Sequence, residues 1–470
     1  MLRLWAAADR SPPLLNSASF KATDSRGLVT GPDVQWDAEG ARLLGAAWAD
    51  VLGLAGADPG SGSGRLVIGR DMRVTSPILA AAFITGVTSR GVDVIDIGLA
   101  STDLLWFASG RLGLPGVMFT ASHNPGDWNG VKFCLSGAAP VTPDHLARLQ
   151  ERVAASTPAC DGEGTVTVQD LLPAYAAHLH SLVDLTDIRR LTVVADAGNG
   201  MAGHTLGAVF ADIDAELIGL YTDLDGSFPH HQPNPLIPEN LIDAQQAVRA
   251  NGADLGLVFD GDADRCFIID ERGAVVDPST LTALIASQEL HREPGATVVI
   301  NTITSRAVSE IVTELGGQIV VSKVGHTSVK AAMAEHDAIF GGEHSAHFYF
   351  REFWGADTGM LAALHTIALL GHSGGTLSEL VQDFTRYASS GEINSTVTDA
   401  QACMAAVAEA FESRGDQDRG DGLTISGPDW WINLRPSNTE PLLRLNVEAP
   451  TTEAVERLRD EVLAIVAAEA

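Results

Sequence analysis

The chain contains the run Thr297-Val298-Val299-Ile300, then a helical stretch from Ser305 to Leu315, and then the run Gln318-Ile319-Val320-Val321. Short β-branched runs joined by a helix predict a βαβ unit with parallel strands. The same pattern occurs twice more, around the helical stretches Ser76–Thr88 and Ala202–Phe210. Three such units predict three similar α/β domains with mixed or parallel sheets.

The C-terminal part of the chain has a different pattern. Three antiparallel strands are predicted here, at Leu423–Ile425, Trp430–Leu434 and Leu443–Val447. A helix is predicted at Thr452–Ala468, because its apolar side chains fall on one helical stripe. We therefore expect a smaller C-terminal α+β domain. The four expected domains are residues 1–168, 169–274, 275–386 and 387–470.

Composition restricts the function. The 470 residues are 45% apolar and carry 60 acidic and 30 basic side chains, a formal net charge of −30. This acidity disfavours nucleic acid and anionic membranes as partners, although basic groups that gather locally can still bind a small anion. We expect no signal peptide and no membrane span. The four cysteines lie far apart without a CxxC pair, so we expect reduced thiols in a cytoplasmic protein.

The first segment that contains candidate catalytic side chains is Thr120-Ala121-Ser122-His123-Asn124-Pro125, with Lys132 seven residues after its end. It follows the apolar run Gly116–Phe119, so it lies at the carboxyl end of a predicted strand, where α/β sheets place active sites. A serine hydroxyl is a poor nucleophile unless a base, a metal or a covalent phosphate alters it. His123 and Lys132 are candidate proton carriers. The alternative interpretation is a polar turn that ends at the Asn-Pro pair.

The second segment is Asp260-Gly261-Asp262-Ala263-Asp264-Arg265, between the strand-like runs Leu255–Phe259 and Phe267–Ile269. Alternate carboxylates on an extended loop converge on one side, and three hard oxygen ligands suit Mg²⁺. An EF-hand is a rival interpretation, since Glu271 falls at loop position 12, but Arg265 replaces the required glycine and strands flank the loop. A solvated acidic turn would leave packed carboxylates to repel each other. We predict a metal site.

The third segment is Gly341-Gly342-Glu343-His344-Ser345-Ala346-His347. Glu343, Ser345 and His347 alternate and would share one face, from which a carboxylate can accept hydrogen bonds from two sugar hydroxyls. A polar edge strand is the alternative interpretation.

The fourth segment is Arg435-Pro436-Ser437-Asn438-Thr439-Glu440-Pro441, with Arg444 downstream. Its side chains and backbone supply hydrogen-bond donors for phosphate in a loop that two prolines make rigid. An ordinary turn is the alternative.

A fifth segment, Gly198-Asn199-Gly200-Met201-Ala202-Gly203, matches the G-x-G-x-x-G pattern, and Asp223 lies 20 residues beyond it. This pattern is typical of dinucleotide-binding proteins and makes an NAD-dependent dehydrogenase a second hypothesis. The pattern is permissive, however, and no acid/base set for hydride transfer lies nearby. The alternative is a glycine-rich turn that close packing requires.

Together the four segments resemble the α-D-phosphohexomutase family, and within it the phosphomannomutase/phosphoglucomutase type. The resemblance runs from Phe20 to the C-terminus and includes Phe20–Gly27, Asp225–His230 and Lys323–His326. It implies three related α/β domains and a smaller fourth domain around a central cleft, and a hexose phosphate as the substrate.

The resemblance also implies roles for individual residues. Ser122 would be the phosphoserine that gives and takes the phosphoryl group, and it would join Asp260, Asp262 and Asp264 around Mg²⁺. Lys132 would be the general acid/base, with His123 beside the reacting serine and with Arg26 and Arg265 near the transferring group. Substrate binding would involve Lys323, His326, Glu343, Ser345, His347, Arg435, Ser437, Asn438, Thr439 and Arg444.

The implied reaction interconverts mannose 6-phosphate and mannose 1-phosphate, with a hexose 1,6-bisphosphate as intermediate and activator. The Glu-x-Ser-x-His pattern at 343–347 is nearer to mannose/glucose enzymes than to glucosamine enzymes. A phosphoglucomutase or a dual enzyme is therefore the closer alternative, and a phosphoglucosamine mutase is less favoured. Thr23, Ile303 and His344 depart from the family pattern and bear on the sugar contacts. A catalytically silent relative is disfavoured because the serine, the lysine and all three aspartates are present.

Overall fold

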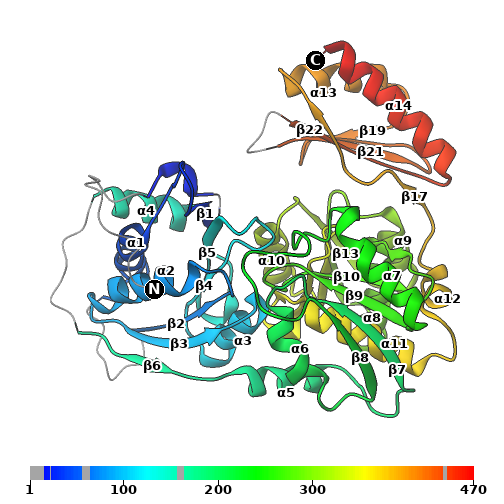
Figure 1. Cartoon of the computed structure of the whole chain (residues 1–470). Helices are drawn as coiled ribbons and strands as arrows, with labels where there is room; N and C mark the ends of the chain where they lie inside the picture. The colour runs from blue at the N-terminus through cyan, green and yellow to red at the C-terminus, as the bar shows by residue number, and fades with distance from the viewer. Residues whose placement is uncertain (1–14, 22, 56–63, 156–162, 438–441, 470) are drawn as a thin grey trace. The chain divides into compact units, whose positions relative to one another are not determined.

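The computed structural model describes residues 15–21, 23–55, 64–155, 163–437 and 442–469. The chain forms two compact units, residues 1–275 with 349–377 and residues 276–348 with 378–470. The strands of the described residues form four sheets, and Figure 1 labels the helices and many of the strands.

The first sheet is mixed and has the strand order β1-β5-β4-β2-β3-β6. Its strands are β1 (Asp24–Leu28), β2 (Arg65–Arg70), β3 (Asp93–Leu99), β4 (Gly116–Phe119), β5 (Trp128–Cys134) and β6 (Val166–Val168). Its helices are α1 (Ala38–Val51), α2 (Ser76–Thr88), α3 (Thr102–Leu112) and α4 (Pro143–Ala154). Strands β2, β3 and β4 run parallel, so the loops after them leave the same edge of the sheet. This edge carries the Ser122 loop.

Helices α1, α2 and α4 pack together, whereas α3 packs on β2 and β4. The core beside α1 and α2 contains Trp36, Trp48, Phe83 and Phe119, which are all fully buried. Burial of such large apolar side chains is the main stabilising term of the fold.

The second sheet has the order β11-β10-β9-β7-β8. Its strands are β7 (Leu191–Asp196), β8 (Ala215–Leu220), β9 (Leu255–Phe259), β10 (Cys266–Asp270) and β11 (Val275–Val276), and its helices are α5 (Leu172–Leu182), α6 (Ala202–Phe210) and α7 (Ile242–Asn251). Strands β7, β8 and β9 are parallel, and β10 is antiparallel to β9 with Phe259 opposite Cys266. This pairing closes residues 260–265 into a tight loop.

The third sheet has the order β13-β12-β14-β15-β16. Its strands are β12 (Thr297–Asn301), β13 (Gln318–Ser322), β14 (Phe340–Gly342), β15 (Phe348–Phe350) and β16 (Ala356–Asp357). The helices in this part of the chain are α8 (Pro278–Arg292), α9 (Arg306–Glu314), α10 (His326–His336), α11 (Gly359–His372) and α12 (Leu377–Gln382). The predicted βαβ unit is confirmed, because β12 and β13 are parallel and α9 joins them.

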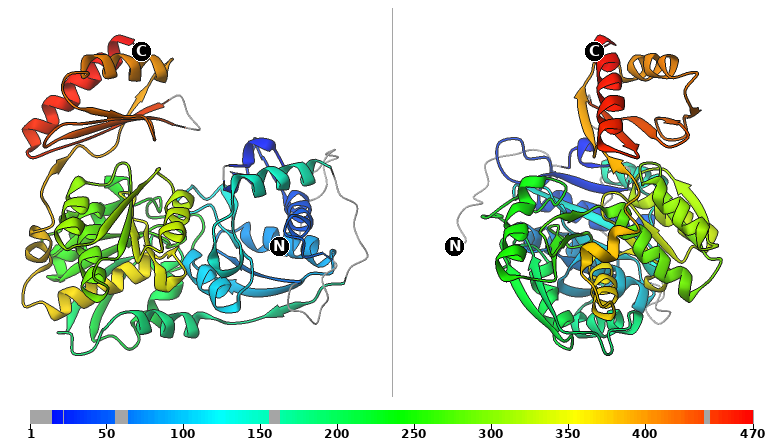
Figure 2. Two further views of the ribbon diagram at one scale, coloured as in Figure 1. Left: turned by 180° about the vertical axis from the view of Figure 1, so that it is seen from behind. Right: turned by 90° about the vertical axis from the view of Figure 1, so that its right-hand side faces the viewer.

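The last sheet is antiparallel, in the order β17-β22-β21-β20-β19, with β18 also paired to β22. Its strands are β17 (Ala388–Ser389), β18 (Ile393–Thr396), β19 (Asp416–Asp418), β20 (Leu423–Ser426), β21 (Trp431–Pro436) and β22 (Leu442–Ala449). Helices α13 (Ala400–Ala410) and α14 (Thr452–Glu469) both lie over one face of it (Figure 2). Alternate residues of β21 and β22, such as Leu434 and Leu445, are buried in that core.

The fold class predicted from the sequence is therefore confirmed: three α/β sheets and a C-terminal α+β part. Strand β14 ends in two glycines, and a Cβ at Gly342 would lie 2.4 Å from Thr282 Oγ1 of helix α8. Only a strand that ends in glycines lets α8 approach so closely. In the parts of the chain that the structure describes, no helix is both long and apolar enough to cross a bilayer.

Candidate active site

Ser122 follows strand β4 and has a left-handed backbone conformation, with a φ of 52°. A non-glycine residue in this conformation is strained and persists only where its surroundings hold it. The N–H of Ser122 donates to Thr120 Oγ1 at 2.9 Å, and its Oγ donates to Asp260 Oδ2 at 2.9 Å. The turn therefore presents a buried hydroxyl to the acidic loop.

Arg73, after strand β2, holds this loop from inside and is fully buried. Its two Nη atoms donate at 2.6–3.0 Å to four carbonyl oxygens of the loop, those of Ser122, Asn124, Pro125 and Trp128. Its Nε pairs with Asp71 at 3.1 Å. A buried guanidinium needs such partners for its five N–H groups, so the Ser122 loop and Arg73 fix each other's positions.

The loop Asp260–Arg265 is buried along its whole length. Lys132, on strand β5, donates through Nζ to Asp262 Oδ2 at 2.7 Å and to Asp264 Oδ2 at 2.5 Å. Arg265 donates to Asp260 Oδ2 through Nη2 at 2.8 Å and through Nε at 3.1 Å. Each aspartate of the loop thus has a cationic partner.

These contacts perturb the pKa values of the group. Burial raises the pKa of Asp260 to about 7, against the lowering effect of Arg265. Burial also acts to raise the pKa of Asp262, but the Lys132 ammonium and a hydrogen bond from Thr102 hold it below its usual range. Burial acts to lower the pKa of Lys132, and the two aspartates outweigh it and raise that pKa. Lys132 is therefore a protonated group at neutral pH.

His123 and Arg26 complete this group. Arg265 Nη2 donates to His123 Nδ1 at 2.7 Å, and since arginine has no acceptor, this bond assigns Nδ1 as an acceptor. Burial, followed by the charges of Arg265 and Arg26, keeps the pKa of His123 well below its ordinary value. Arg26, on β1, pairs with Asp24 at 2.8 Å and contacts Asn124 Oδ1 at 3.4 Å. The first unit thus brings together all the predicted catalytic and metal-binding residues.

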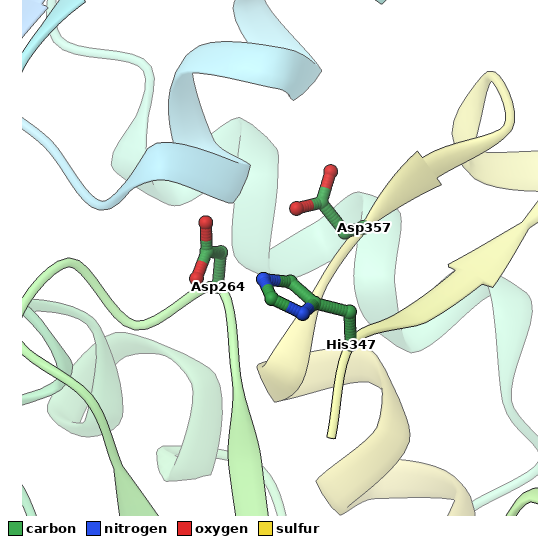
Figure 3. Close-up of side chains that lie close together, drawn as sticks. All are labelled: Asp264, His347 and Asp357. Carbon is green, nitrogen blue, oxygen red and sulfur yellow. The ribbon is translucent and has the colours of Figure 1, made fainter. Parts of the chain in front are cut away.

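The acidic loop fits a hard divalent cation. Carboxylate oxygens of Asp260, Asp262 and Asp264 lie within 4.8 Å of one another, and Asp262 Oδ1 is buried without a hydrogen-bond partner in the described residues. An orphaned carboxylate oxygen in such a cluster is suited to a metal ion. The three aspartates of the loop can therefore bind a metal. Asp357, on strand β16, lies beside one of them, with an oxygen within 4.8 Å of one from Asp264; Figure 3 shows both side chains.

The glycine pattern at 198–203 forms a close-packed turn. A Cβ at Gly200 would lie 2.7 Å from the carbonyl oxygen of Gly261, and one at Gly203 would lie 2.1 Å from that of Thr222. The Met201 N–H also donates to the Gly261 carbonyl at 2.9 Å. These glycines let the turn support the acidic loop, in agreement with the packing interpretation and not with a dinucleotide site.

Helix α3 supports the same loop from the other side. The Thr102 N–H donates to the Asp262 carbonyl at 2.9 Å, and Thr102 Oγ1 donates to Asp262 Oδ2 at 2.6 Å. The next residue, Asp103, is buried and accepts hydrogen bonds from Ser101, from Tyr175 at 2.6 Å and from Thr358 at 2.8 Å. Asp103 therefore ties the start of α3 to α5 and to the start of α11.

In the second unit, the predicted sugar loop is assembled around Glu343, whose side chain is buried. Glu343 Oε2 accepts from Asn301 Nδ2 at 2.8 Å and from the Gly325 N–H at 3.2 Å. Ser345 Oγ lies 2.9 Å from His347 Nδ1, and that nitrogen is 3.8 Å from Glu343 Oε1. The three side chains lie close together because residues 343–347 form a tight turn, in which the Ala346 N–H donates to the Glu343 carbonyl at 3.0 Å, and not because they alternate along a strand.

Other predicted substrate residues lie around this loop. His326 begins helix α10, with its ring centroid 6.5 Å from that of His347, which Figure 3 also draws. Lys323 precedes α10 and is exposed. His344 is directed elsewhere, with its Nδ1 3.4 Å from Ser279 Oγ, so this departure from the family pattern does not join the Glu343 face.

The predicted phosphate loop opens onto a cavity of about 540 Å³, whose lining includes Arg435, Ser437, Arg444, Arg419, Asp421 and Val324. Arg435 and Arg444 stand directly opposite each other on strands β21 and β22. The Val324 N–H donates to Asp421 Oδ2 at 2.8 Å, which connects the Lys323–His326 segment to this cavity. Asn438 and Thr439, also predicted to bind phosphate, lie outside the described residues.

Sequence reasoning missed Arg73, Thr102 and Asp103. A signal was available, because Asp71-x-Arg73 and Ser101-Thr102-Asp103 follow β2 and β3 in the same way that the Ser122 loop follows β4. Polar residues at the carboxyl ends of adjacent parallel strands meet at one edge. The sequence prediction considered only the loop after β4, which contains Ser122.

Four family models match the chain in order. They describe phosphoglucomutase/phosphomannomutase α/β/α domain I at residues 17–159, domain II at 173–273, domain III at 277–387 and the C-terminal domain at 392–465. The chain therefore belongs to the phosphoglucomutase/phosphomannomutase family, and it is an isomerase.

Relatives agree with this assignment. A phosphomannomutase of Salmonella montevideo is 38% identical, over 92% of this chain and 95% of that protein. A protein of Xanthomonas campestris that is named among the phosphohexose mutases is 40% identical, over 92% of this chain and 94% of its own length. The crystal structure of a phosphoglucomutase/phosphomannomutase family protein from Burkholderia thailandensis is 30% identical, with a TM-score of 0.87 over 97% of this chain and 98% of that one.

Proposed function

We propose that the protein is a phosphomannomutase that interconverts mannose 6-phosphate and mannose 1-phosphate through a phosphoserine and a hexose 1,6-bisphosphate. The observation that carries this proposal is the convergence of Ser122 Oγ, three buried aspartates, Lys132 and Arg265 in one cluster. Relatives that carry the name phosphomannomutase support the choice of mannose.

Ser122 is the proposed carrier of the phosphoryl group. Phosphoryl transfer needs in-line positioning and neutralisation of the charge on the equatorial oxygens. The Ser122 turn supplies the positioning, because Thr120 and Arg73 hold its backbone. Arg265 and Arg26 supply positive charge beside the hydroxyl. Lys132, which is buried beside these groups, is the proposed general acid/base toward the sugar oxygen.

Asp260, Asp262 and Asp264 are the proposed ligands of Mg²⁺, together with Ser122. When bound there, the cation would neutralise charge on the transferring phosphoryl group. Thr102 and Lys132 both hold Oδ2 of Asp262, so Oδ1 would be the oxygen available to a metal ion.

In the second unit, Glu343 and Ser345 are proposed to bind sugar hydroxyls, with His326, His347 and Lys323 beside them. Asn301 holds one oxygen of Glu343 and so orients the carboxylate for this role. Arg435, Ser437, Asn438, Thr439 and Arg444 are proposed to bind the phosphate that does not react.

Phosphoglucomutase activity, alone or in a dual enzyme, is the second candidate. Its basis is the Glu-x-Ser-x-His pattern at 343–347, which resembles that of enzymes acting on mannose and glucose alike. The proposed domains end at residues 168, 274 and 386; the first two boundaries fall between the matched family ranges, and the third lies beside the end of one.

We also propose a cytoplasmic location, which the buried thiols of Cys134, Cys266 and Cys403, none of them in a disulfide, support.

The experiment compares mannose 1-phosphate, glucose 1-phosphate and glucosamine 1-phosphate side by side, with Mg²⁺ and glucose 1,6-bisphosphate. The proposal predicts the highest kcat/KM for mannose 1-phosphate, with glucose 1-phosphate second. A higher kcat/KM for glucose 1-phosphate would favour the second candidate, and turnover of glucosamine 1-phosphate alone would contradict both.

A further inference from the structure

The two arginines of the phosphate cavity form an unfavourable pair on their own. Arg435 and Arg444 are directly opposite across β21 and β22, and like charges in this relation repel each other. Their side chains are 13% and 32% exposed, so water screens the repulsion only in part. In addition, Arg444 Nε is buried with no hydrogen-bond partner in the described part of the chain. Such a pair needs an anion between its members.

Glu392 supplies that anion in this structure. One of its carboxylate oxygens lies 3.6 Å from Arg435 Nη2, and the other lies 3.4 Å from Arg444 Nη1. The residue precedes strand β18, and the pairing of Asn394 with Arg444 brings it to this position. A single carboxylate is therefore shared by the two guanidinium groups.

The geometry of Glu392 is that of a loose counter-ion. Charge-assisted N–H···O bonds are about 2.7–2.9 Å long, whereas the contacts of Glu392 with the two arginines are 3.4, 3.5 and 3.6 Å long. Asp421 differs, because it lies 4.0 Å from Arg435 Nη1 while its Oδ2 accepts the Val324 N–H at 2.8 Å. Asp421 is held by the fold, whereas the contacts of Glu392 to the arginines are weak enough to exchange.

We propose that Glu392 is a displaceable counter-ion, which the substrate phosphate replaces between Arg435 and Arg444. The inference rests on the proposed phosphate-binding role of these arginines. A doubly charged phosphate can offer one oxygen to each guanidinium and outcompete a singly charged carboxylate. Singly charged anions gain little from the exchange. Glu392 thereby weakens phosphate binding in the ground state and selects for dianions.

The test uses inorganic phosphate as the probe, with its dissociation constant measured by titration calorimetry on the full chain without divalent metal. Glu392→Gln removes the competing charge and keeps the side-chain shape. We expect it to bind phosphate about three- to tenfold more tightly than the wild type and to lower the KM for mannose 1-phosphate. Preference for phosphate over acetate should also fall. Glu409→Gln, an exposed position on α13, controls for the change in net charge.

Two outcomes separate failure of this inference from failure of the proposed function. If Glu392→Gln binds phosphate as the wild type does, or more weakly, Glu392 is a support for the arginines and the inference is wrong. Arg435→Ala should lose phosphate affinity in both backgrounds. If Arg435→Ala binds phosphate unchanged, the proposed phosphate site itself fails.

Discussion

Ser122 Oγ lies 2.9 Å from Asp260 Oδ2, although 138 residues separate the two in the sequence. The serine follows a strand of the first sheet, and the aspartate follows a strand of the second. Their contact places a hydroxyl, on a strained backbone, against a carboxylate that also contacts Arg265. The proposed chemistry depends on this contact and on the residues that maintain it.

Arg73→Lys should lower kcat by about two orders of magnitude, because a misplaced catalytic group is costly even when the change is small. Lysine keeps the positive charge beside Asp71. Its ammonium group has only three N–H donors, however, and lacks the planar guanidinium that reaches four carbonyl oxygens. Steady-state kinetics measure the effect. Arg190→Lys is the control, since Arg190 forms an exposed pair with Asp214. Near-normal kcat in Arg73→Lys would show that the loop does not need this support.

Gly200→Ala should destabilise the protein by about 1–3 kcal/mol, because the new Cβ would press on the Gly261 carbonyl. Gly207 lies in helix α6, which follows this turn, with nothing within 4 Å of its Cβ position. Gly207→Ala should therefore raise stability by up to about 1 kcal/mol through helix propensity. Urea unfolding compares the two variants, and equal effects of the two substitutions would contradict this packing argument.

Much of the fold could be predicted because it depends on local pattern. The β-branched runs around Ser305–Leu315 and the stripe of Thr452–Ala468 each specify an element without reference to the rest of the chain. The Asp260 loop and the Ser122 segment could also be located, since each follows an apolar strand and groups reactive side chains.

The rest depends on which strands are neighbours in the sheets. Arg73 follows β2 as the Ser122 loop follows β4, but its contact with that loop is known only once β2 and β4 are seen to pair. Glu392 likewise reaches Arg444 only because β18 pairs with β22.

Asp262→Asn should abolish the effect of Mg²⁺ on stability. A ligand that binds the folded state raises its melting temperature, and this variant loses one charged ligand and its pairing with Lys132. Thermal melts with and without Mg²⁺ measure the shift, and Asp214→Asn, at an exposed position, is the control. Chelation should likewise stop turnover in the wild type, and Mg²⁺ should restore it. An unchanged Mg²⁺ shift in Asp262→Asn would place the metal elsewhere.

Asp103 should make stability depend on pH. Burial raises the pKa of this carboxyl from 3.8 to about 6, against the lowering effect of its three hydrogen bonds. Because the folded state holds the proton more tightly than the unfolded state, stability falls as the pH rises through this window, by up to about 3 kcal/mol. Asp103→Asn removes this dependence. Melting temperatures of the two proteins between pH 4.5 and 7 test this prediction. The melting temperature of the wild type should fall relative to that of Asp103→Asn as the pH rises. A constant difference between the two melting temperatures would refute the assignment.

The central claim is that Ser122 carries the phosphoryl group. The most direct measurement incubates the protein with Mg²⁺ and glucose 1,6-bisphosphate and then maps its peptides by mass spectrometry. The account predicts an added mass of about 80 Da on Ser122, corresponding to one phosphate, and a loss of several orders of magnitude in turnover for Ser122→Ala. Phosphate on another residue of the active wild type, or near-normal turnover by Ser122→Ala, would contradict it.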